Sequence, residues 1–166
     1  MAKPYQYATP ICIFLSLFAF LGAVIGVIKS NPLIMIVFLL PTVIYEVYRT
    51  EGKSTKWASW ALLAVLIAEI VLIVAKVSFD FAAFLGTTEE VVGGYTVPLG
   101  DIKVVGPVIM AVLAIILFTR TRGRYTKWLA SIIFVASFII IYTLDPTVFT
   151  RLMRIAVKEG LKQIRY

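Results

Sequence analysis

Apolar residues gather in five long runs separated by three short polar connections and one long loop. The runs cover approximately residues 10–28, 33–48, 57–77, 104–118 and 128–144. An α-helix rises about 1.5 Å per residue, and about 20 apolar residues are needed to cross the hydrocarbon layer of a bilayer. The pattern therefore predicts an all-α integral membrane protein with about five transmembrane helices, which make residues 1–146 a transmembrane domain.

A nine-residue pattern occurs twice, each time between two apolar runs. Residues 49–57 and residues 120–128 both read R-T-x-G-[K/R]-x-T-K-W. Each copy is expected to form a loop of about eight residues that joins two spans. The repetition predicts a tandem duplication of a membrane hairpin, with both hairpins in the same orientation.

The lysine and tryptophan that end each copy are candidate interface anchors. These residues are Lys56, Trp57, Lys127 and Trp128. Lysine side chains meet anionic headgroups, and tryptophan rings gather at the headgroup level of a bilayer. The simplest interpretation is anchoring at the interface, and a docking surface for a partner protein is the alternative.

The charge pattern predicts an orientation in a cell membrane. The chain has 16 Lys and Arg against 9 Asp and Glu, and its cations gather at the ends of the apolar runs. Such cations meet anionic lipid headgroups, and no basic soluble module indicates nucleic-acid binding. By the positive-inside rule, the N-terminus and loops 49–56 and 120–127 are expected in the cytoplasm, and the acidic loop 79–103 outside.

The C-terminal residues 147–166 predict a basic amphipathic helix. Five cations recur every three or four residues and fall in one stripe: Arg151, Arg154, Lys158, Lys162 and Arg165. Such a stripe suits an anionic membrane surface or an acidic partner. Five spans place this helix outside the cell, which its charge disfavours, so the side of the membrane on which it lies stays open.

Two glycine-containing segments predict local structure. Gly22 and Gly26 form a G-x-x-x-G pair, which can let another helix approach closely, although such pairs also occur by chance in membrane helices. In the long loop, residues 91–97 predict two short β runs around a Gly-Gly turn. Residues 79–85 predict a short interfacial helix.

Missing residue types limit the chemistry that the chain can perform. His is absent and Cys12 is the single cysteine. A zinc site of the His/Cys type, a His-ligated haem and a Ser-His-Asp or Cys-His hydrolase therefore lack their essential groups. We expect no metal, no cofactor and no enzymatic activity, and we interpret Cys12 as a small apolar residue.

Glu69 is the main candidate for a functional residue inside the membrane. An ionised carboxylate at mid-membrane costs at least about 2.5 kcal/mol, so its side chain is expected to face the bundle interior, a cavity or a partner. It acts either as a proton or cation relay, or as a protonated or hydrogen-bonded group that holds helices together. Lys76 is expected on the same helical face. Glu46 is expected to pair with Arg49 or to be hydrated at the membrane boundary.

The sequence favours a non-enzymatic function. The chain lacks catalytic groups and is small for a transport pathway unless it oligomerises, and its peripheral segments offer docking surfaces. The leading hypothesis is a structural or accessory subunit that packs against other membrane proteins. The expected partners are the lipid bilayer with its anionic headgroups and either other membrane protein subunits or copies of the chain in a homo-oligomer. The alternative is a small oligomeric channel or transporter, coupled to ions or protons, that uses Glu69.

Overall fold

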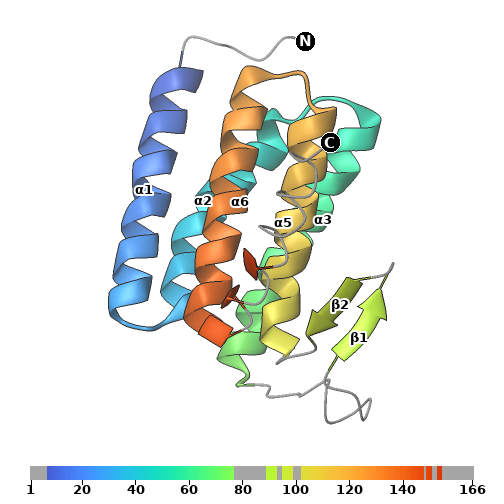
Figure 1. Ribbon diagram of the computed structural model, residues 1–166. Helices are drawn as coiled ribbons and strands as arrows, with labels where there is room; N and C mark the ends of the chain where they lie inside the picture. Colours follow the sequence, from blue (N-terminus) through green and yellow to red (C-terminus); the bar gives the residue numbers. More distant parts are fainter. Residues whose placement is uncertain are drawn as a thin grey trace.

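The computed structural model describes residues 7–76, 89–92, 95–98, 102–147, 149–150 and 153–154. In chain order the elements are α1 (Ala8–Ile28), α2 (Pro32–Arg49), α3 (Lys53–Val74), β1 (Glu89–Val92), β2 (Tyr95–Pro98), α5 (Ile102–Arg120) and α6 (Arg124–Leu144). Figure 1 shows the helices standing side by side, with the two strands at one end of the bundle. The predicted interfacial helix at residues 79–85 lies outside the described residues.

Four of the helices form a closed ring. Helix α2 packs against α3, α3 against α5, α5 against α6, and α6 back against α2, while α1 lies outside the ring against α2 and α6. The side chains that fill the ring are apolar and fully buried: Leu39, Val43, Leu62, Leu66, Met110, Leu117, Ile133 and Ile140. The core of the protein is therefore the interior of a four-helix bundle.

All five helices are long and apolar enough, by length and composition, to cross a membrane. Large apolar side chains are exposed on each of them, including Phe14, Ile44, Ile67, Val112 and Val135. A surface with apolar side chains on every helix is unusual for a soluble monomer. Such a surface is compatible with lipid, and the prediction of five helices that are long and apolar enough to span a membrane is confirmed.

The connections inside the repeated pattern are shorter than expected. Helix α3 begins at Lys53 and α6 begins at Arg124, so only residues 50–52 and 121–123 lie between helices. Gly52 has a φ of 111°, a conformation that favours glycine and allows the tight turn. The expected loops of about eight residues were wrong because the residues after each glycine form the first helical turn.

The glycine pair of α1 lies at a close helix contact. A Cβ atom at Gly22 would overlap the side chain of Phe38, and one at Gly26 would overlap that of Met35. Both contacts are on α2, so the two glycines let α1 and α2 approach. The packing role of the G-x-x-x-G pair is confirmed.

The two strands form an antiparallel hairpin. Glu89 pairs with Pro98, and Val92 pairs with Tyr95. The predicted β runs are therefore confirmed. The predicted all-α class holds for the five long helices, and the described residues also contain this two-stranded hairpin.

The predicted C-terminal stripe lies almost wholly outside the described residues. Arg151, Lys158, Lys162 and Arg165 are not among those residues. Arg154 is described and is exposed. The amphipathic tail helix therefore stays a prediction.

Candidate functional site

The two copies of the repeated pattern meet at one end of the bundle. The α2–α3 and α5–α6 connections lie at the same end, opposite the β hairpin (Figure 1). A polar pocket of 320 Å³ lies between them, lined by Arg49 and Glu51 from the first copy and by residues 121–126 of the second. The fold thus joins two segments that are far apart in the sequence into one site.

An arginine of the first copy contacts a tyrosine of the second. Arg49 is 9% exposed, and its Cζ lies 5.2 Å from the centroid of the Tyr125 ring. This distance is within the range of a cation–π interaction. The Tyr125 hydroxyl also forms a 2.8 Å hydrogen bond with Thr9 Oγ1 at the start of α1. These contacts hold α1, α2 and α6 together at the pocket.

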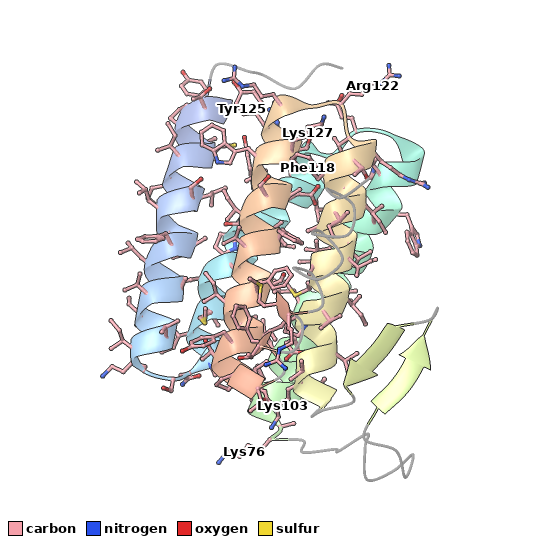
Figure 2. All side chains as sticks on the ribbon, in the orientation of Figure 1. Lys76, Lys103, Phe118, Arg122, Tyr125 and Lys127 are labelled. Carbon is pink, nitrogen blue, oxygen red and sulfur yellow. The ribbon has the colours of Figure 1, made fainter. Side chains whose placement is uncertain are left out.

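The pocket has an excess of positive charge. Arg49, Arg122 and Arg124 line it, against the single carboxylate of Glu51. Figure 2 shows Arg122 and Tyr125 at this end of the molecule, and Lys76 and Lys103 at the other. Helix α6 also begins here, and its N-cap residue, Gly123, has no side chain to accept a capping hydrogen bond. Both features suit an anion.

The α2–α3 hairpin, which includes the first copy, contains a buried carboxylate with hydrogen-bond donors. Glu46 is fully buried, and its Oε1 accepts hydrogen bonds from the Thr50 hydroxyl and from Ser59 Oγ, the latter at 3.1 Å. The expectation that Glu46 is hydrated at the membrane boundary was wrong. Thr42, Glu46 and Thr50 are four residues apart on one face of α2, and this spacing could have indicated the buried polar stripe.

The α5–α6 hairpin, which includes the second copy, lacks this carboxylate. In the register of the repeated pattern, Leu117 stands where the first copy has Glu46, and Ala130 stands where it has Ser59. Both are fully buried. Thr121, the equivalent of Thr50, is 7% exposed, and its hydroxyl has no hydrogen-bond partner within the part of the chain that the structure describes.

Glu69 lies inside the bundle, as expected from its position in an apolar run. Its side chain is 1% exposed, and its carboxylate lies against Gly106 of α5. A Cβ atom at Gly106 would overlap Oε2 and would lie 2.9 Å from Cδ. The space that Gly106 leaves for this carboxylate was not predicted. Ile140, the equivalent of Glu69 in the second copy, is buried and apolar.

Lys76 does not share a helical face with Glu69. Helix α3 ends at Val74, and Lys76 follows it with a φ of 50°, in the left-handed region. Its side chain is exposed at the end of the bundle opposite the repeated pattern (Figure 2). The expectation of a shared face was wrong because the helix ends before this residue.

The candidate anchors differ between the two copies. Lys56 and Trp57 are exposed on the first turn of α3, and Trp57 is 70% exposed. Trp128 instead donates a 3.1 Å hydrogen bond from Nε1 to Ser16 Oγ on α1, and Lys127 Nζ lies 5.6 Å from the centroid of the Phe118 ring. One tryptophan is therefore free to meet a membrane surface, whereas the other joins α6 to α1.

An apolar groove runs between α1 and α6. Its volume is 400 Å³, and its lining includes the small side chains of Ser16, Ala19, Ala23, Ser131 and Ala136. A second apolar hollow of 260 Å³ lies on the other side of α6, against α5. Both hollows are lined by helices that are long and apolar enough to cross a membrane.

Among the described residues, no group of three or more His, Cys, Asp and Glu side chains could hold a metal ion. Cys12 is buried. Comparisons with protein-family models, with curated proteins and with solved structures gave no match. The fold is that of a helical protein with five helices long and apolar enough to cross a membrane, four of them in a closed ring.

Proposed function

We propose that this chain is a non-enzymatic integral membrane protein that packs against other membrane proteins as a structural or accessory subunit. The observation that supports this function best is the apolar groove between α1 and α6. The occupant that we propose for the groove is a transmembrane helix of a partner protein.

The groove has the dimensions and lining of a helix-packing site. It follows α6 from Trp128 to Ile139, about 16 Å at the rise of an α-helix. Small side chains at a membrane interface let two helix backbones approach, and close packing is a main source of association free energy in lipid. Ala19, Ala23 and Ala136 supply such side chains here.

The proposed orientation follows from charge. The N-terminus and both copies of the repeated pattern lie in the cytoplasm, and loop 79–103 lies on the opposite side of a cell membrane. This orientation is supported by the position of the α2–α3 and α5–α6 connections at one end of the bundle (Figure 1). The same arrangement supports a duplicated hairpin, since two parallel copies turn at the same membrane face.

Replacing a groove residue tests the proposed packing. Ala136→Phe fills part of the groove, and Ala68→Phe is the matched control, because Ala68 is exposed on α3 away from it. Tagged variants are purified in mild detergent from membranes of the source cells, and co-purified proteins are identified by mass spectrometry. We expect stoichiometric partners with the wild type and with A68F, and their loss with A136F.

Two results would contradict this function. If A136F and A68F retain the same proteins in equal amounts, the groove is not the packing site. If the wild type purifies without any stoichiometric partner, as a homo-oligomer alone, the accessory function is wrong and transport is favoured.

The second candidate function is proton or cation transport by an oligomer. It is favoured by two carboxylates, Glu46 and Glu69, which are both buried inside the ring. Ser59, which contacts Glu46, precedes Glu69 by ten residues on α3, a rise of about 15 Å. Leu62 and Leu66 lie between them and are fully buried, so the two carboxylates are separated by an apolar layer.

Flux measurements in liposomes test transport. Glu69→Gln removes the charge and keeps the shape, so a relay through Glu69 predicts proton or cation flux with the wild type and its loss with E69Q. Equal flux in both proteins, or none in either, would exclude Glu69 as a relay.

A further inference from the structure

We propose that the two copies of the repeated pattern together form one binding site for a phosphate group, carried by a lipid headgroup or by free phosphate. The site is the polar pocket between Arg49 and residues 121–126. This inference is independent of the groove between α1 and α6, which lies along the membrane-facing side of the protein.

The charge of the pocket selects an anion. Three arginines line it, and Glu51 offsets only one of them. Guanidinium groups bind phosphate through paired N–H donors, and the resulting hydrogen bonds are stronger than those between neutral groups. Because the arginines come from both copies, neither hairpin alone would supply the whole set.

The Thr121 hydroxyl is the observation that points to a ligand. Nearby hydroxyls of the second hairpin donate to backbone carbonyls: Thr119 Oγ1 to Ile115 O at 2.9 Å, and Thr126 Oγ1 to Gly123 O at 2.7 Å. Thr121 Oγ1 is buried, and it has no such partner among the described residues. A buried hydroxyl without a partner costs about 1–3 kcal/mol, and an acceptor in the pocket removes this cost.

The two copies differ at this hydroxyl for an identifiable reason. Thr50 donates to Glu46 Oε1, whereas the residue at the equivalent place in the second copy is Leu117. The second copy keeps the donor and lacks the internal acceptor. Thr121 lines the pocket, so a phosphate oxygen in the pocket is the acceptor that we propose for its hydroxyl.

The pocket also has the size and helix geometry that a phosphate group requires. Its 320 Å³ is near the lower end of the range of about 300–1,000 Å³ for small-molecule sites. Helix α6 starts at its edge, so the first N–H groups of a 21-residue helix add a partial positive charge.

Lipid binding by purified full-length protein tests the site. The protein in neutral detergent is mixed with phosphatidylglycerol or phosphatidylcholine, and bound lipid is counted by native mass spectrometry. In a second arm, sodium phosphate replaces sodium chloride at equal ionic strength, and the unfolding temperature is recorded. The variants are Thr121→Val, Thr121→Ser and the pair Arg122→Gln/Arg124→Gln, and the charge-matched control is Lys29→Gln/Lys76→Gln, two exposed residues outside the pocket.

We expect phosphatidylglycerol to bind the wild type, T121S and the lysine control with affinities within about twofold of one another. Loss of one hydrogen bond to a charged group should lower the affinity of T121V by about tenfold, and the arginine pair should lower it at least as much. Retention of phosphatidylglycerol without a response to sodium phosphate identifies a lipid headgroup. A saturable rise in unfolding temperature with sodium phosphate, absent in T121V, identifies free phosphate as a ligand.

The proposal is overturned if neither arm detects binding, or if T121V binds as the wild type does. It is also overturned if the lysine control loses as much affinity as the arginine pair, because the attraction would then be general surface charge. T121S separates a missing hydroxyl from a folding defect, since it keeps the hydroxyl while changing the packing.

Discussion

The α2–α3 and α5–α6 hairpins have the same nine-residue pattern but differ in how their polar groups are satisfied. In the first hairpin, Glu46 is buried and accepts hydrogen bonds from Thr50 and Ser59. In the second, the equivalents of Glu46 and Ser59 are Leu117 and Ala130, and the hydroxyl of Thr121 has no partner among the described residues. The comparison shows that Thr50 has an acceptor within its own hairpin, whereas its equivalent Thr121 lines the pocket without one among the described residues.

Giving the second hairpin the acid of the first should have the largest effect. Leu117→Glu buries a carboxylate that has Thr121 as its one donor from the pattern, and we expect a loss of at least about 3 kcal/mol in the free energy of unfolding. Adding Ala130→Ser supplies the second donor and should restore part of the lost free energy of unfolding. Unfolding by dodecyl sulfate in mixed micelles measures the stability of both variants. If L117E is as stable as the wild type, the two hairpins are not equivalent in register.

The reverse exchange should have a smaller effect. Glu46→Leu leaves the Thr50 hydroxyl without its acceptor and should cost about 1–3 kcal/mol, whereas Ser59 keeps its 3.2 Å bond to Thr55 O. In the double variant Glu46→Leu/Thr50→Val the stranded donor is removed, and most of the loss should be recovered. The same micelle titration checks this, and equal stability of the single and double variants would contradict the assigned hydrogen bond.

Gly106→Ala tests the other buried acid of the first hairpin, Glu69. The added methyl group overlaps the Glu69 carboxylate, so we expect a loss of about 1–2 kcal/mol in the free energy of unfolding. In a Glu69→Ala background, Gly106→Ala should lower the free energy of unfolding much less. An equal loss in both backgrounds would mean that Gly106 is needed for a reason other than space for Glu69.

The two tryptophans should show the smallest difference. Trp128→Phe removes the hydrogen bond to Ser16 and should lower the unfolding free energy by about 1 kcal/mol. Trp57→Phe changes an exposed ring and should leave stability within about 0.5 kcal/mol of the wild type. Thermal unfolding of both variants in the same detergent compares their stabilities. A larger loss of stability for Trp57→Phe than for Trp128→Phe would contradict the roles given to the two tryptophans.

The spans could be predicted from the sequence because an apolar run of helical length has few alternatives in a bilayer. The β runs and the glycine pair of α1 could also be predicted, because a Gly-Gly turn and small residues four positions apart indicate specific local structures. The shorter connections were missed because Lys53–Trp57 and Arg124–Trp128 are polar or mixed in character, and this polarity hid the first turns of α3 and α6.

The site could be predicted only in part. Glu69 is unusual in its own run, so its burial was foreseeable, whereas the space at Gly106 depends on how α3 meets α5. Glu46 was misjudged because its nearness to Arg49 in sequence indicated the membrane boundary, while its helical face decides its burial. The pocket combines residues from two hairpins, and only the closed ring of helices brings them together.

The central claim is that the two copies of the repeated pattern meet in one pocket, and cross-linking tests it directly. In a Cys12→Ala background, Glu51→Cys and Arg122→Cys place one thiol in each copy, and Glu51→Cys with Lys103→Cys is the control, with one thiol on each side of the α3–α5 loop but at opposite ends of the bundle. Treatment of membranes with a short bifunctional maleimide, followed by cleavage within the α3–α5 loop, should leave the first pair joined and the control separated. Separation of the first pair would contradict the paired site.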